Sequence, residues 1–113
     1  MLARVAGWVI LLALNLAPIS ASAQLAQYQI TFKPNGTFEP SQLEVAAGRF
    51  RIMLVNESDE AVEFESLRLR QEKGLGPGVT SSIVLTLSRP GNYPFFDDFH
   101  PQQQGVLVVL PSP

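Results

Sequence analysis

Residues 90–100 read Pro-Gly-Asn-Tyr-Pro-Phe-Phe-Asp-Asp-Phe-His, and the interpretation of the whole chain starts from this segment. Its Pro-Gly pair predicts a turn, and the aromatic residues that follow predict a strand. The segment ends in a predicted loop with Asp97, Asp98 and His100, the only histidine of the chain. Carboxylates and imidazoles are common metal ligands. We therefore expect a metal site in the loop that follows this strand.

The sequence outside this segment predicts an all-β domain. Short runs of alternating apolar and polar residues are separated by turn-forming residues, which is the pattern of β-strands. Strands are expected at residues 28–32, 43–45, 50–55, 62–69, 79–87, 92–96 and 105–110, with a Gly-Pro-Gly loop at 74–78. About seven short strands predict a Greek-key β-sandwich or barrel. The nearly continuous apolar runs at 52–55 and 106–110 predict central strands that are buried on both faces.

The N-terminal segment has the pattern of a secretory signal peptide. Arg4 precedes an apolar run at 5–16, and the small residues Ala21-Ser22-Ala23 form a cleavage motif. The run is shorter than the roughly 20 residues that a membrane span needs. We expect a signal peptide at 1–23 and one domain at 24–113, with an uncleaved anchor as the alternative.

The composition limits the classes of function. Without Arg4 the expected mature chain has seven basic and ten acidic residues, a net charge of −3. An acidic domain without a basic patch is a poor binder of nucleic acid. The chain has no cysteine, so it has neither a disulfide nor a thiolate ligand.

Over about residues 28–110 the chain resembles the cupredoxins, the small blue-copper proteins. In that family a turn and an aromatic strand lead to a cysteine, to a histidine three residues later and to a last strand. The residues that match are Pro90, Gly91, Tyr93, Phe95, Phe96, His100 and Gly105. The resemblance implies a Greek-key β-sandwich with a metal near the loop histidine.

The chain also departs from the cupredoxin pattern. Asp97 stands where the copper thiolate would be, and residues 101–104 include no methionine. A second histidine is missing as well. Blue copper requires two histidines, a cysteine and a weak axial ligand. The sequence therefore excludes a blue-copper electron carrier.

A more detailed likeness is to the cupredoxin-like proteins of bacterial iron uptake, including the cupredoxin domain of EfeO-type proteins. It rests on the expected signal peptide and on the segments 63–66 (Glu-Phe-Glu-Ser), 70–73 (Arg-Gln-Glu-Lys), 76–78 (Gly-Pro-Gly) and 95–100. The resemblance implies a periplasmic metal-binding protein that acts with a membrane iron permease. Its role there would be to carry or to oxidise ferrous iron, and the sequence leaves the choice between the two open.

Glu63 and Glu65 are the carboxylates expected nearest the loop histidine. Residues two apart on a strand share a face, about 6.5–7 Å apart. Leu67 and Leu69 continue the same face. Either the register changes near Ser66, or the glutamates point inward, where a carboxylate needs a partner such as a metal ion. A solvated strand face is the alternative.

The candidate metal ligands are His100, Asp97, Asp98, Glu63, Glu65 and Glu72. Carboxylates with one imidazole suit iron, manganese, zinc or Cu(II) better than Cu(I). We expect iron or copper and leave the choice open. The alternatives are a solvated histidine, aspartates that only form a turn, and an ion pair between Glu72 and a basic neighbour.

Two functions are consistent with these observations. The first is an exported metal-binding protein that handles iron or copper as an accessory to a membrane iron permease. If it oxidises ferrous iron, copper bound elsewhere or an external acceptor must take the electron. The second is a metal-free β-sandwich that binds a periplasmic protein partner through the acidic loop 57–60 and the arginines Arg68 and Arg70. Whether the protein forms a homodimer is left open.

Overall fold

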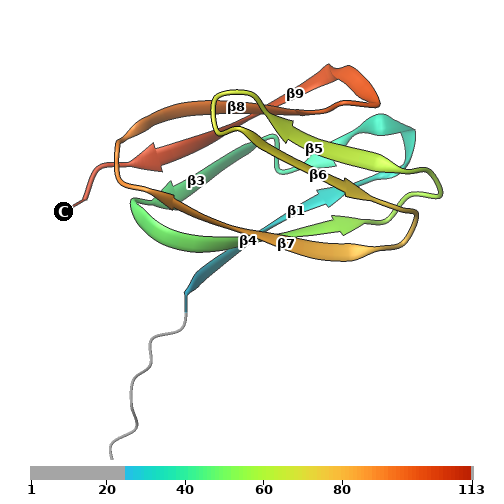
Figure 1. The fold of residues 1–113 in the computed structure, drawn as a ribbon. Coiled ribbons are helices and arrows are strands. Elements are labelled where there is room, and N and C mark those ends of the chain that lie inside the picture. Colours follow the sequence, from blue (N-terminus) through green and yellow to red (C-terminus); the bar gives the residue numbers. More distant parts are fainter. Residues whose placement is uncertain (1–24, 113) are drawn as a thin grey trace, which may run out of the picture.

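Two β-sheets pack face to face in the computed structural model, which describes residues 25–112. One sheet has the strand order β2-β1-β4-β7 and the other the order β3-β9-β8-β5-β6 (Figure 1). The strands are β1 (Ala26–Phe32), β2 (Phe38–Glu39), β3 (Gln42–Ala46), β4 (Gly48–Asn56), β5 (Val62–Ser66), β6 (Gln71–Leu75), β7 (Thr80–Leu87), β8 (Gly91–Asp97) and β9 (His100–Leu110). The all-β sandwich prediction is confirmed. The predicted signal peptide at 1–23 lies outside the described residues.

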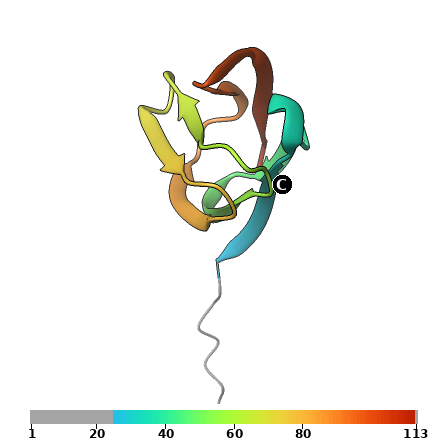
Figure 2. The same ribbon diagram turned by 90° about the vertical axis from the view of Figure 1, so that its right-hand side faces the viewer.

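The alternation of apolar residues determines which face of each strand lies in the core. Phe32, Phe50, Phe64 and Phe95 are almost completely buried between the sheets. Figure 2 shows the ribbon of the sandwich turned by 90°. The rings of Phe64 and Phe95 stack with centroids 5.2 Å apart. A Cβ on Gly105 would lie 2.5 Å from the Phe95 ring, so a glycine is needed where β9 passes this core. Aromatic burial of this kind is the main stabilising contribution in a small β-domain.

Four strands differ from the sequence predictions, and one of them, the two-residue β2, was not predicted. β6 lies partly in the predicted Gly-Pro-Gly loop, and β9 begins at His100 instead of 105. The strand expected at 62–69 ends at Ser66, and a turn follows in which Arg70 has a φ of 56°. β6 has the sequence Gln-Glu-Lys-Gly-Leu, which has little β-propensity, and it forms by pairing at the sheet edge with β5.

The two nearly continuous apolar runs do lie in central strands. β4 has β1 and β7 as neighbours, and β9 has β3 and β8. Their burial nevertheless alternates, with buried residues toward the core and half-buried ones on the outer face. Two-sided burial was therefore a wrong prediction, because the outer faces have no covering layer among residues 25–112.

Four segments meet at one end of the sandwich. They are the short 3-10 helix at Pro34–Gly36, the 56–60 loop, the start of β5 and the turn between β8 and β9. The Asp98 N–H donates a hydrogen bond of 2.9 Å to the Glu63 carbonyl, which joins the turn to β5. Within the described part of the chain, no helix has the length and hydropathy needed to cross a membrane.

Candidate functional site

Asp97 is the last residue of β8 and points into the sandwich, with 1% of its surface exposed. A carboxylate buried to this extent needs hydrogen-bond donors. Its Oδ1 accepts bonds of 3.0 Å from the backbone N–H groups of Glu63 and Phe99. Its Oδ2 lies 3.0 Å from His100 Nδ1. Because an ionised carboxylate can only accept, this bond places a proton on Nδ1.

The His100 ring is held on several sides. Its Nε2 lies 3.5 Å from Glu60 Oε1, while its other ring nitrogen, Nδ1, is bonded to Asp97. Gly36 has a φ of 76°, and a Cβ there would lie 2.6 Å from His100 Cδ2. Only a glycine fits both this backbone conformation and this close approach. The alternative of a freely solvated histidine is therefore wrong.

Glu63, Glu65 and Glu72 form a second group, on the outer face of the five-stranded sheet. Each offers a carboxylate oxygen, and these atoms all lie within 4.8 Å of one another. Glu65 and Glu72 are directly opposite each other on β5 and β6. Asp98, in the β8–β9 turn, lies beside this group. We call these four residues the outer carboxylate cluster.

Of the two arrangements left open for the β5 glutamates, the inward one is wrong. Val62, Phe64 and Ser66 are buried, and Glu63 and Glu65 alternate with them as half-buried residues on the outer face. The register change expected near Ser66 occurs through the turn that follows it.

The charges of the cluster repel one another. Partial burial raises the pKa of Glu63 above 4.5, and the nearby Glu72, Asp98 and Glu65 raise it further. Partial burial also raises the pKa of Glu65, followed by repulsion from Asp98 and Glu72. Within residues 25–112 none of the four carboxylates forms an ion pair with a lysine or arginine. The alternative of an ion pair between Glu72 and a basic neighbour is therefore wrong.

The six predicted ligands thus separate into two groups. Asp97 and His100 face inward at the end of the sandwich, whereas Glu63, Glu65, Glu72 and Asp98 lie outside. The strand pairing explains the separation: Asp97 is opposite the buried Phe64, and the outward Glu65 is opposite Phe96. Glu60, the neighbour of His100, was not predicted as a site residue, because its contact depends on how the 56–60 loop folds back.

Comparison with known proteins agrees with this fold. Residues 4–109 match the cupredoxin-like domain family. The chain belongs to that family. A protein of Rickettsia prowazekii (strain Madrid E), described as uncharacterized, is 33% identical over 94 residues, which are 81% of this chain and 74% of that protein.

Two solved cupredoxins have the same fold. Reduced auracyanin of Roseiflexus castenholzii is 17% identical with a TM-score of 0.65, over 79% of this chain and 100% of that one. The purple cupredoxin of Nitrosopumilus maritimus is 19% identical with a TM-score of 0.57, over 73% of this chain and 98% of that one. The cupredoxin-like Greek-key sandwich is confirmed. The family supports a copper-protein-like or metal-related role.

The residues of this cupredoxin-like chain do not fit a blue-copper centre. The sequence lacks the cysteine and has one histidine where two are needed. Asp97, at the thiolate position, already uses both of its oxygens in hydrogen bonds within the protein. The carboxylate therefore braces the loop at the position where the family has a metal ligand.

Replacing Asp97 by alanine tests this bracing role. Asp97→Ala leaves two backbone N–H groups and the His100 ring without their acceptor, which should lower the free energy of unfolding by about 2–5 kcal/mol. The exposed Asp98 is a matched control, and Asp98→Ala should change stability by no more than about 0.5 kcal/mol. Urea denaturation measures both. Equal and small losses in the two variants would contradict the role assigned to Asp97.

The raised pKa of Glu65 predicts how stability depends on pH. A carboxyl group with a raised pKa in the folded state binds its proton more tightly when folded, so its contribution is greatest at low pH. The contribution of Glu65 to stability is lost as the pH rises from about 4.5 through the pKa that Glu65 has in the folded protein. In chelator-treated protein, Glu65→Gln should therefore have a higher Tm than wild type at neutral pH, and the difference should disappear toward pH 4.

Thermal unfolding across this pH range measures the effect. Glu44→Gln is the control, since Glu44 is exposed on β3, at the opposite edge of the sheet from β6. A Glu65→Gln variant that is less stable than wild type at neutral pH would show that the Glu65 carboxylate is not repelled by Asp98 and Glu72.

Proposed function

We propose that this protein is exported to the periplasm and binds iron as cargo at the outer carboxylate cluster, for delivery to a membrane iron permease. The observation that supports this most is the convergence of carboxylate oxygens from Glu63, Glu65 and Glu72 within 4.8 Å. Further support comes from the signal-peptide pattern at 1–23 and from the resemblance to the cupredoxin domain of EfeO-type proteins.

The chemistry of the cluster favours iron over copper. Its ligands are all hard oxygen donors, which suit iron or manganese better than Cu(I). A bound cation would also relieve the repulsion that raises the pKa of Glu63 and Glu65. Because carboxylates bind metals in their deprotonated form, affinity should increase with pH. The outward position of the cluster suits a cargo that must be released.

Asp97 and His100, which we call the inner pair, have a different role in this proposal. Asp97 holds the β8–β9 turn against β5 and so positions Asp98 next to Glu63. His100 supports the same turn through its bond to Asp97.

The cluster would also favour oxidation of its cargo, since carboxylates stabilise ferric over ferrous iron. An external acceptor or copper bound elsewhere would have to take that electron.

Anaerobic calorimetric titration with Fe(II) at neutral pH tests the proposal. Wild type should bind one ion per chain, and Glu63→Gln and Glu65→Gln should each raise the Kd about tenfold or more, because each removes a charged ligand. Glu44→Gln should retain binding, and His100→Ala should weaken it less than either glutamate variant, because His100 contributes no ligand to the cluster.

Two results would contradict the assignment. Binding that is lost in His100→Ala but unchanged in the glutamate variants would place the ion at the inner pair. No binding in wild type would favour the metal-free, partner-binding alternative.

A further inference from the structure

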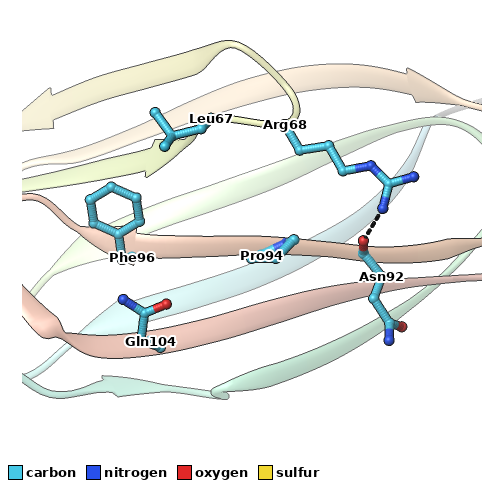
Figure 3. Close-up of a pocket in the computed structure, with 6 residues that line it drawn as sticks. All are labelled: Leu67, Arg68, Asn92, Pro94, Phe96 and Gln104. Atoms are coloured by element: carbon cyan, nitrogen blue, oxygen red, sulfur yellow. Dashed lines mark hydrogen bonds between the residues drawn. The ribbon is translucent and has the colours of Figure 1, made fainter.

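The outer face of the five-stranded sheet has an apolar hollow next to the carboxylate cluster. Its volume is about 580 Å³, and it is lined by Leu67, Arg68, Asn92, Pro94, Phe96 and Gln104 (Figure 3). Leu67 is 72% exposed, the most of any large apolar side chain in the described residues. Contiguous apolar surface of this kind on a soluble domain commonly marks an interaction site.

The hollow has opposite charges at its two ends. At one end Arg68 covers the part of the β8 edge that does not pair with β5. Its guanidinium donates a hydrogen bond to the Asn92 carbonyl. The Arg68 Cζ lies 4.3 Å from the centre of the Tyr93 ring. At the other end, beyond Phe96, are Glu63 and Asp98. The bond to Asn92 uses one of the five N–H donors of the Arg68 guanidinium.

These two ends are placed symmetrically along β8. Arg68 is level with Asn92, three residues before Phe95, and Glu63 is level with Asp98, three residues after it. Consider a two-fold axis that lies in the plane of this face and runs perpendicular to β8 at Phe95. It would place the positive end of one copy against the negative end of the other. A surface with this property is complementary to itself, as a two-fold symmetric interface requires.

We propose that this face is a homodimer interface, in which Arg68 of each copy pairs with Glu63 and Asp98 of the other. Leu67, Pro94 and Phe96 of the two copies pack together at the centre, in the manner of two stacked sheets. The contact goes beyond the proposed iron function and is an alternative use of the same surface, because Glu63 and Asp98 pair with Arg68 in the dimer instead of with a cation. One sheet face is a small interface, so the dimer forms in a concentration-dependent way.

Sedimentation velocity of chelator-treated protein over a wide concentration range tests the proposal independently of metal binding. Wild type should change from monomer to dimer as its concentration rises. Arg68→Glu and Glu63→Arg should each raise the dimer dissociation constant about tenfold or more, because they bring like charges together. An equimolar mixture of the two variants should dimerise again, since both contacts then join opposite charges.

Two further variants keep the test decisive if Arg68→Glu folds poorly. Leu67→Asp alters only an exposed side chain and should abolish the dimer. Arg49→Glu changes an exposed charge on β4, in the other sheet, and should leave the dimer intact. A wild type that stays monomeric, a Leu67→Asp variant that still dimerises, or folded charge variants that fail to recombine would each overturn the proposal.

Discussion

The buried carboxylate of Asp97 connects the elements at the end of the sandwich where the candidate chemistry lies. Its three hydrogen bonds reach β5, the β8–β9 turn and the His100 ring. A charge buried this deeply is tolerated only while such donors are present. The position of Asp98 relative to Glu63, and with it the shape of the outer carboxylate cluster, depends on these bonds. Asp97 thus braces a loop that in blue-copper proteins is organised around a metal.

The two-residue period of β-strands explains why the candidate ligands separate into two groups. On β8 the residues Tyr93, Phe95 and Asp97 face the core, whereas on β5 Glu63 and Glu65 face outward. The outer carboxylate cluster offers oxygen atoms only, while Asp97 and His100 offer an imidazole whose Nδ1 is already hydrogen-bonded to the Asp97 carboxylate. Two groups with different donor atoms are the consequence of strand geometry.

Much of the fold could be predicted from the sequence, and part of the site could not. Alternating residues such as Ile83 and Leu85 on β7 identify a strand by themselves, because the pattern is local. β6 has no such pattern and depends on pairing with β5, which is a tertiary interaction. The same limit applies to Glu60, whose contact with His100 arises when the 56–60 loop meets the start of β9. The inward direction of Asp97, by contrast, follows from its parity with Phe95 and was available in the sequence.

The most direct test of this account is to locate a bound ion by anomalous diffraction from crystals grown with Fe(II) under anaerobic conditions. The account predicts one anomalous peak within coordination distance of Glu63, Glu65 and Glu72, with the bond between Asp97 and His100 intact. A peak at the His100 ring, with Asp97 turned from its backbone donors to become a ligand, would contradict it.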